Sequence, residues 1–216
     1  MDVDGFTMWI TGGSLILVAP QVSEPERRDV LASLRHAQSL ADSVQARFEQ
    51  HRRWYRAYRS ALGRHGWRVT HSCQSVETAD GRTLLSPTQP LLLWLGSQHG
   101  ALGEVLASCI DSLAVMQPGL EQLSRRALQR RRDTTRLVLE LGILSAGAQL
   151  SLCSIALETC APLDADWLRA PLSGAGLRGD LYFQSLMAEP APGLQEDRRD
   201  DFARLLGHDS FDPTLH

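Results

Sequence analysis

A chain of 216 residues with 43% hydrophobic content is long enough to bury one substantial core. Its 22 basic residues are all arginine and stand against 25 acidic residues, and the net charge of −3 argues against general nucleic-acid binding, which requires a positive excess. Because the chain has no lysine, it cannot supply the lysine that P-loop NTPases, protein kinases and pyridoxal-phosphate enzymes each require.

The N-terminal segment predicts neither a signal peptide nor a membrane span. It begins MDVDG, which is acidic where a secretory signal requires positive charge. The apolar stretch that follows is interrupted at Gly12 and Gly13, and it is therefore too short to cross a bilayer. Residues 6–19 are typical of a short hairpin or an extended arm around this glycine turn.

A long amphipathic helix is predicted next. Ser23 precedes Glu26 by three residues with Pro25 between them, which is a capping box with proline in the first turn. Apolar residues then recur at alternating spacings of four and three, at Val30, Leu34, Ala37, Ala41, Val44 and Phe48. The same apolar spacing continues into residues 51–62, which contain Trp54, Tyr55 and Tyr58.

Residues 51–73 predict a helix end, a glycine turn and the start of a strand. Tyr55, Tyr58 and Leu62 share one helical face, while most of the arginines point the other way. After Gly66, apolar and polar residues alternate as in a half-buried strand. We expect four residues of this segment to be buried together: Trp54, Tyr58, Leu62 and Trp67.

The same residues carry a resemblance. Trp54, Tyr55, Tyr58, Leu62, Gly66 and Trp67 form a WYxxYxxxLxxxGW pattern. In this pattern, and in the order of elements over residues 24–206, the chain resembles uncharacterised short bacterial proteins with an N-terminal helical pair and a β-rich C-terminal half. The resemblance implies a fold arrangement and no activity. The absence of Lys and Asn independently indicates a GC-rich coding genome and a bacterial source.

In the second half of the chain, the sequence pattern changes from one typical of helices to one typical of β-strands. Pro87 and Pro90 open a helical region that ends at Pro118, and a shorter arginine-rich helix follows over residues 120–132. Residues 134–144 and 149–160 flank a Ser-Ala-Gly-Ala turn, which predicts a β-hairpin, and residues 179–189 predict a third strand. A proline-rich joint then leads to a last acidic helix.

Helices first and strands second predict an α+β fold, in which N-terminal helices pack on a C-terminal antiparallel β-sheet with a final short helix. We expect a single domain over residues 1–216. Its helical part would span about 24–132 and its β-rich part about 133–216.

Two motifs give weak indications of enzyme chemistry. The G-x-G-x-x-G match at residues 174–179 is followed by a strand rather than a helix, so it does not predict a dinucleotide site. His71 and Cys73 would lie on one strand face, as a thiolate–imidazole pair or as two metal ligands. No further ligand or base stands at a suitable spacing, and a half-buried histidine beside a core cysteine is the favoured interpretation.

The cysteines favour free thiols in a reducing compartment, and hence a cytoplasmic protein. They are far apart, mostly in apolar runs and without CxxC spacing, at Cys73, Cys109, Cys153 and Cys160. We expect no metal and no cofactor.

The charges are unevenly distributed. Residues 24–72 hold ten Arg and five acids, residues 120–140 hold six Arg and three acids, and residues 189–212 hold three Arg and seven acids. We expect these regions to neutralise each other within the fold or between subunits. A purely solvated face, and contact with an anionic surface or acidic lipid, are the alternatives. The predicted interaction residues are Arg125, Arg126, Arg130, Arg131 and Arg132.

The favoured function is a non-enzymatic bacterial interaction or assembly protein that forms a homo-oligomer or binds a protein partner. A membrane-interacting, pore-forming or toxin-like protein is the first alternative, because 17 residues between Glu140 and Glu158 carry no charge and bilayer-spanning strands need about 9–11 residues each. An enzyme that uses His71 and Cys73 is the second alternative.

Overall fold

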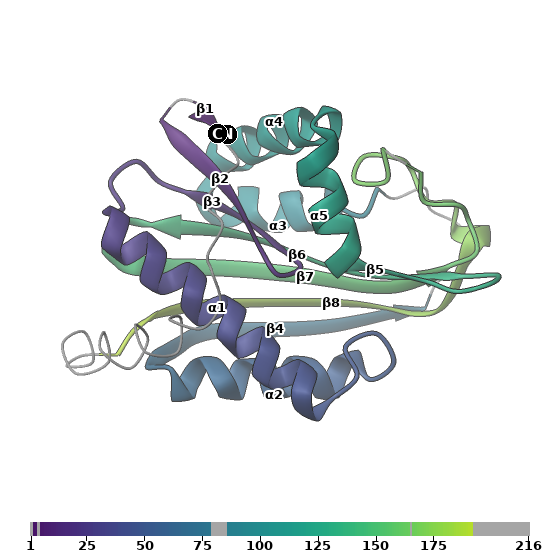
Figure 1. The fold of residues 1–216 in the computed structure, drawn as a ribbon, viewed down its shortest axis with the longest axis horizontal. Helices are drawn as coiled ribbons and strands as arrows, with labels where there is room; N and C mark the ends of the chain where they lie inside the picture. Colours follow the sequence, from purple (N-terminus) through teal and green to yellow (C-terminus); the bar gives the residue numbers. More distant parts are fainter. Residues whose placement is uncertain (1, 4, 79–85, 165, 192–216) are drawn as a thin grey trace.

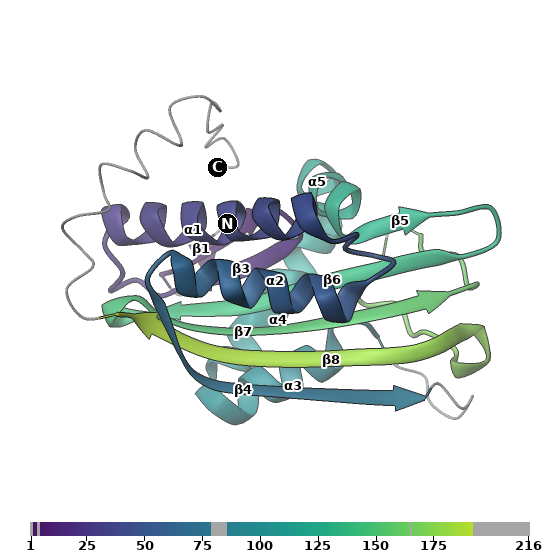
Figure 2. The same cartoon turned by 90° about the horizontal axis from the view of Figure 1, so that it is seen from below.

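In the computed structural model, a central β-sheet lies between two layers of helices (Figure 1 and Figure 2). Residues 2–3, 5–78, 86–164 and 166–191 are described. The helices in these ranges are α1 (Glu24–Val44), α2 (His51–Arg64), α3 (Gln89–His99), α4 (Leu102–Val115) and α5 (Gln117–Ala127). The strands are β1 (Asp2–Val3), β2 (Phe6–Thr11), β3 (Ser14–Val18), β4 (Trp67–Thr78), β5 (Leu128–Arg130), β6 (Thr135–Ser145), β7 (Gln149–Thr159) and β8 (Leu177–Pro190).

The described strands form one sheet in the order β1-β2-β3-β6-β7-β8-β4, with β5 also paired to β6. Neighbouring strands run antiparallel except β3 and β6, which are parallel with Ser14 opposite Glu140. β7 pairs along one edge of β6. Along the other edge, β3 pairs with residues 140–144 of β6 and β5 pairs with residues 135–137. β4 stands last in this order and pairs only with β8 among the described strands, so it is an outer strand of the sheet.

Each face of the sheet has its own hydrophobic core because successive side chains of a strand point to opposite faces. On one face, called the α3–α5 face, Leu139, Leu141 and Ile143 of β6 pack with buried residues of α3, α4 and α5. On the other, called the α1–α2 face, Leu144 of β6 and Leu152 of β7 pack with α1 and α2. The central hairpin β6–β7 is thus covered from both sides.

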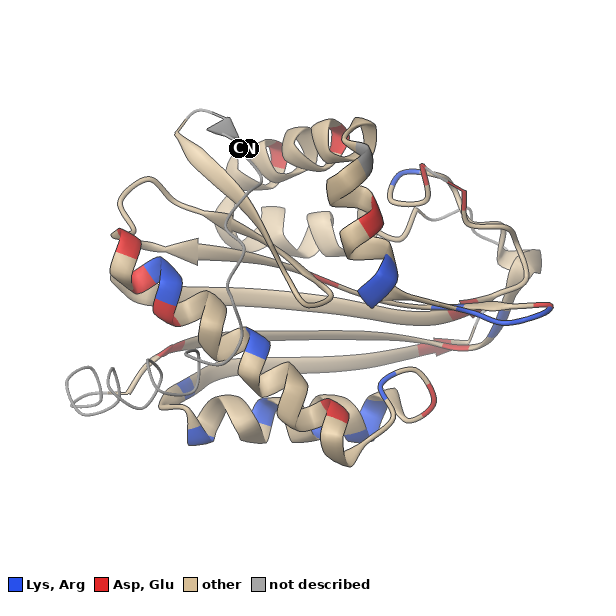
Figure 3. Cartoon of the chain, in the orientation of Figure 1, with Lys and Arg blue, Asp and Glu red and all other residues tan. Residues whose placement is uncertain are grey.

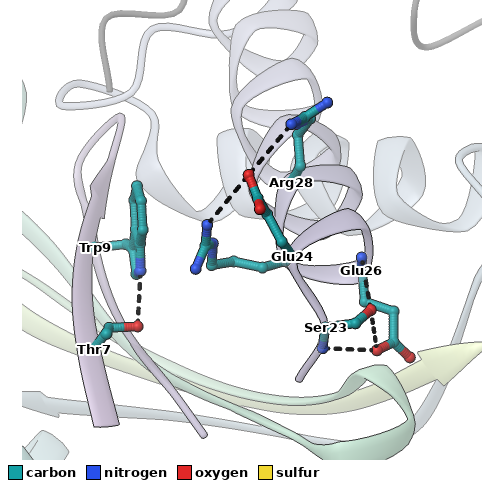
Figure 4. A network of polar contacts seen from close by, with 7 residues as sticks. Thr7, Trp9, Ser23, Glu24, Glu26 and Arg28 are labelled. Carbon is teal, nitrogen blue, oxygen red and sulfur yellow. Dashed lines mark hydrogen bonds and ion pairs between the residues drawn. The ribbon is translucent and has the colours of Figure 1, made fainter. Parts of the chain in front are cut away.

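The start of α1 is fixed by polar contacts (Figure 4). The Ser23 hydroxyl accepts a hydrogen bond from the backbone N–H of Glu26, and the Glu26 carboxylate accepts one from the backbone N–H of Ser23. Arg28 pairs with Glu24 at 3.4 Å, and the guanidinium of Arg27 lies 4.5 Å above the ring centroid of Trp9 in β2. The capping box predicted from the sequence is confirmed.

The predicted arrangement of N-terminal helices on a C-terminal antiparallel sheet is wrong. Strands β1 to β3 lead the chain, β4 lies between α2 and α3, and the sheet is mixed because β3 joins β6 in parallel. β6 is buried from residue 137 to 144 and requires a neighbour on each edge, and the apolar strand Ser14–Val18 provides the second one. The predicted final helix lies outside the described residues.

The aromatic cluster is confirmed, whereas the single long helix is not. Trp54, Tyr58 and Leu62 are at most 2% exposed and Trp67 is 8% exposed, and all four belong to the core of the α1–α2 face. The helix is divided because Gln45 is extended and caps α1, so that α2 begins after a turn and packs against α1. The predicted hairpin and third strand are confirmed as β6, β7 and β8.

Candidate functional site

The outer strand β4 pairs only with β8 among the described residues. Its first residue, Trp67, is buried and donates a hydrogen bond from its indole nitrogen to Ser33 of α1 at 2.7 Å. The register shifts between Val69 and His71, which marks a β-bulge with Thr70 as the extra residue. Residues 71–74 are then exposed. The outer edge of β4 therefore offers backbone N–H and C=O groups that another strand could pair with.

This edge lacks the side chains that usually protect an outer strand. Residues 69–76, VTHSCQSV, contain no Asp, Glu, Lys, Arg or Pro, and the charged residues Arg68 and Glu77 stand only at the two ends. Natural edge strands are commonly blocked by charges or proline, which oppose pairing with a second sheet. The bulge lies near the start of β4 and leaves residues 71–78 in regular pairing with β8.

His71 and Cys73 lie on the exposed part of β4. They stand opposite Met187 and Ser185 of β8, so they share the α3–α5 side of the sheet, as predicted, but both are exposed rather than half-buried. Neither side chain has a hydrogen-bonded orienting partner within the described chain, and no group of three metal-ligating residues is found there. The expectation of a core cysteine is wrong at Cys73, which is exposed on the outer strand of the sheet.

The five predicted interaction arginines are all exposed, and Figure 3 shows basic residues at the end of α5 and in the turn between β5 and β6. Arg125 and Arg126 end α5, Arg130 ends β5, and Arg131 and Arg132 follow in the turn to β6. Arg131 pairs with Glu49 at 2.6 Å and Arg125 pairs weakly with Glu121 at 3.8 Å. The structure thus brings the five residues to one region, where some already have acidic partners within the chain.

The acidic counterpart predicted at residues 189–212 is described only at its beginning. Glu189 of β8 pairs with Arg68 of β4, and not with the five arginines. Residues 192–212 lie outside the described chain. Neutralisation of α5 by this segment therefore stays a prediction.

A buried row of polar side chains crosses the sheet, and the sequence interpretation missed it. Ser14, Glu140, Ser154 and Gln184 stand opposite one another on β3, β6, β7 and β8, and each is at most 2% exposed. Cross-strand neighbours point to the same face, and here that is the α1–α2 face. Glu140, a single acid within the otherwise apolar strand 137–144, is the sequence signal that could have indicated it.

The two helices contact one end of this polar row. The Glu140 carboxylate accepts hydrogen bonds from Ser14 at 2.6 Å and from the Tyr58 hydroxyl at 3.1 Å. Gln38 of α1 donates to Ser14 at 2.6 Å. Burial raises the pKa of Glu140, although Ser14, nearby Arg47 and Tyr58 all favour its charged form.

The other end of the row has few partners. The hydroxyl of Ser154 and both amide atoms of Gln184 have no hydrogen-bond partner among the described residues, and neither do the two ring nitrogens of His51. Burial, with a contribution from Arg47, lowers the pKa of His51 to about 3. The His51 ring is thus neutral at physiological pH, packed between Trp54, Tyr55 and Tyr182.

No family model and no curated protein matches the sequence. The fold is similar to that of a solved structure titled delta-endotoxin, with a TM-score of 0.49 and 10% sequence identity over 94% of this chain and 93% of that chain. At this level of similarity, neither a family nor an activity follows for this chain. Within the described residues, no helix has the length and apolar character that crossing a bilayer would require.

Proposed function

We propose that this protein is a non-enzymatic assembly protein, and that two copies associate by pairing their β4 strands edge to edge. The observation that carries the proposal is the uncharged outer edge of β4 over residues 69–76. Strand addition provides backbone hydrogen bonds without requiring a dedicated pocket. A second copy is the favoured occupant because the strand is complementary to itself.

The self-complementarity follows from the register. If Cys73 lies opposite Cys73 of the second copy, Ser72 faces Gln74 and His71 faces Ser75. Thr70 is the extra residue of the bulge, so Val69 then meets Val76 and Arg68 meets Glu77 of the second copy. An antiparallel, two-fold symmetric pairing of this kind is a closed dimer that uses one surface twice.

The side-chain directions agree with this register. Val69 and Val76 stand opposite Ala188 and Tyr182, which both lie on the α1–α2 side, so the two valines can pack together. Arg68 and Glu77 stand opposite Glu189 and Leu181, on the α3–α5 side. The opposite charges at the two ends would therefore meet on the same face and favour this register over shifted ones.

The enzyme alternative receives less support. A thiolate–imidazole pair needs an orienting group and enclosure from water, whereas His71 and Cys73 are exposed on an outer strand. The membrane alternative rested on the uncharged residues 141–157. In this fold they form the centre of β6–β7, with apolar side chains buried on both faces, which explains the absence of charge.

Sedimentation velocity over a wide concentration range tests the proposal. Wild type is expected to dimerise, and Cys73→Arg to remain monomeric because two cations would meet at the two-fold axis. Gln98→Arg on α3, which adds the same charge at another exposed position, is the matched control and should dimerise like wild type. A monomeric wild type at every concentration, or a dimeric Cys73→Arg, would contradict the proposal.

The salt dependence of association distinguishes an interface at the β4 edge from one formed by the five predicted interaction arginines. The Debye length falls from about 10 Å at 0.1 M to about 3 Å at 1 M salt, so pairing held by backbone hydrogen bonds and valines should persist where charge pairing weakens. Association that disappears at 1 M salt and in an Arg130→Ser, Arg131→Ser, Arg132→Ser variant would instead assign the interface to the arginines. Binding of monomers to acidic-lipid vesicles through those arginines would favour the membrane alternative.

A further inference from the structure

A pocket of about 690 Å³ lies between α5, β5 and the residues Pro162, Leu163, Asp164 and Trp167. Its apolar wall is formed by four buried side chains, Leu120, Leu128, Leu163 and Trp167. The volume falls within the range of about 300–1,000 Å³ that is typical of small-molecule sites. The pocket is separate from the β4 edge, so its occupation is independent of the proposed assembly.

The rim of the pocket is cationic. Arg125, Arg130 and Arg131 belong to the lining, whereas Arg126 and Arg132 do not. Two acids, Glu121 and Asp164, also belong to the lining, and Glu49 outside it pairs with Arg131. The positive charge that is available to an anionic ligand is therefore that of Arg130, which has no ion pair in the described part of the chain.

Arg130 is the arginine with the greatest capacity for a new partner. Arg125 and Arg131 already contact Glu121 and Glu49. Arg130 donates to the backbone carbonyl of Leu163 at 3.3 Å and has no acidic partner within 4.0 Å in the described part of the chain. This contact holds the guanidinium beside the apolar wall, where its remaining N–H groups can form a two-pronged contact with a carboxylate.

The apolar wall is itself held in place. The indole nitrogen of Trp167 donates to the Ser124 hydroxyl of α5 at 2.9 Å, which ties Trp167 to the helix. Trp167 is 1% exposed and Leu163 is 6% exposed. A ligand therefore meets a wall that is already formed, and little ordering is needed when it binds.

From this combination we infer that the pocket binds a small organic carboxylate with an apolar body, whose carboxylate contacts Arg130 and whose apolar part lies against Leu128, Leu163 and Trp167. The chemistry is that of a free medium-chain or aromatic acid. Neither Arg130 nor the apolar wall would suffice alone for binding, because a contact with an exposed arginine is weak without an apolar partner.

Isothermal titration calorimetry with sodium octanoate tests the inference. Octanoate should bind with one site per chain, and sodium hexanoate roughly fifteenfold more weakly, since each buried methylene contributes roughly a factor of four. Acetate, which lacks the apolar body, and octanamide, which lacks the charge, should each bind at least about tenfold more weakly than octanoate.

Two variants test whether octanoate binds at Arg130. Arg130→Gln should weaken octanoate binding about tenfold or more, because it removes the charge but keeps a side chain of similar length. Arg132→Gln removes an equal charge two residues away, outside the lining, and should leave the affinity within about twofold of wild type. Both positions are exposed, so both variants should fold.

Equal affinities for acetate and octanoate, or octanoate binding that Arg130→Gln leaves unchanged, would overturn the inference. Phosphatidylserine vesicles distinguish a lipid surface from a free acid. Vesicle binding that depends on Arg130 without any binding of octanoate would also overturn it.

Discussion

The two faces of the sheet are packed by different chemistry, and β6 contributes to both. Toward α3, α4 and α5 it places Leu139, Leu141 and Ile143 in an apolar core. Toward α1 and α2 it places Glu140 in a polar row that continues through Ser14, Ser154 and Gln184. Apolar packing is non-directional, whereas hydrogen bonds require partners in defined positions. We infer that the polar row fixes the placement of α1 and α2 on the sheet, in addition to any stability that it provides.

The row itself has two unlike ends. At the β3–β6 end, Glu140 has hydrogen-bond donors from Ser14 and Tyr58 and lies near the buried cation Arg47. At the β7–β8 end, the side chains of Ser154 and Gln184 lack partners among the described residues. Substitutions at the first end should be costly, and substitutions at the second should not.

The largest effect is expected for Glu140→Ala, which should lower the free energy of unfolding by about 3–5 kcal/mol. It leaves the Ser14 and Tyr58 hydroxyls without their acceptor, and it removes one of the two acids, Asp42 and Glu140, that favour the charged form of the buried Arg47. Urea denaturation at pH 7 measures the loss. Glu140→Gln keeps an acceptor for both hydroxyls and should lose less. Equal stabilities of the Ala and Gln variants would contradict the directional role of this carboxylate.

Leu141→Ala provides the comparison on the opposite face. It removes an apolar side chain that is 0% exposed, and about 2–5 kcal/mol is the usual cost of such a truncation. The two variants should differ in how they affect the rest of the chain. Leu141→Ala should retain the near-ultraviolet circular dichroism of the Trp54–Tyr58 cluster, whereas Glu140→Ala should reduce it because α2 loses its polar anchor.

The next effect is a pH dependence that comes from the α1–α2 face. The folded-state pKa of His51 is about 3, below its usual value of 6.5, so between these values the unfolded chain binds a proton that the folded chain does not. The contribution of His51 to the free energy of unfolding is fully present above pH 6.5. It is lost as the pH falls toward 3, at up to about 1.4 kcal/mol per pH unit. Denaturation of wild type and His51→Phe from pH 7 to pH 4 measures it. A wild-type slope that His51→Phe leaves unchanged would exclude His51 as its origin.

Glu140 acts in the opposite direction. Its raised pKa means that the folded chain keeps a proton after the unfolded chain has lost it, so this contribution is present at pH values below about 4.5 and is lost as the pH rises through the folded-state pKa. Glu140→Gln removes this dependence and leaves that of His51. The two groups can therefore be measured separately on the same face.

The smallest effect is expected for Gln184→Leu, at the β7–β8 end of the row. Replacing a buried amide that has no partner among the described residues by an apolar side chain of similar size should change stability by less than about 1 kcal/mol, and can increase it. Thermal denaturation compares it with wild type. A loss as large as that of Glu140→Ala would show that Gln184 has partners, such as buried water, and that the row acts as one continuous network.

Local signals in the sequence predicted much of this structure, and the arrangement of strands was beyond them. The Ser23–Glu26 capping box, the Ser145–Ala148 turn and the apolar periodicity of α1 from Val30 to Ala41 act over a few residues and are confirmed, whereas Val44 is exposed and Phe48 lies outside α1. The pairing of β3 with β6 joins residues more than a hundred positions apart, as does that of β4 with β8. No periodicity specifies such long-range pairs. The break between α1 and α2 also lacks a glycine or proline signal.

The sites show the same limit. The five arginines were chosen for their density along the chain, and only the fold separates those that line the pocket, such as Arg130, from Arg132, which does not. His71 and Cys73 were predicted on one face of a strand, which is confirmed, but their exposure depends on β4 being the outer strand. The polar row becomes visible only when the register places Glu140 between Ser14 and Ser154.

Disulfide cross-linking tests the pairing of β4 strands most directly. Cys73 and Cys160 are both free and exposed, whereas Cys109 and Cys153 are buried, so the chain contains its own control. With copper–phenanthroline and oxygen as the oxidant, opposed Cys73 residues should form a disulfide, because directly opposite residues of antiparallel strands have Cα atoms about 4.5–5.5 Å apart, within the range of about 4.4–6.8 Å for a disulfide. We expect rapid formation of a dimer on a non-reducing gel, with Cys73 linked to Cys73 by mass spectrometry, in wild type and in Cys160→Ser. Cross-links that form no faster through Cys73 than through Cys160, or that persist in Cys73→Ser at the wild-type rate, would contradict the account.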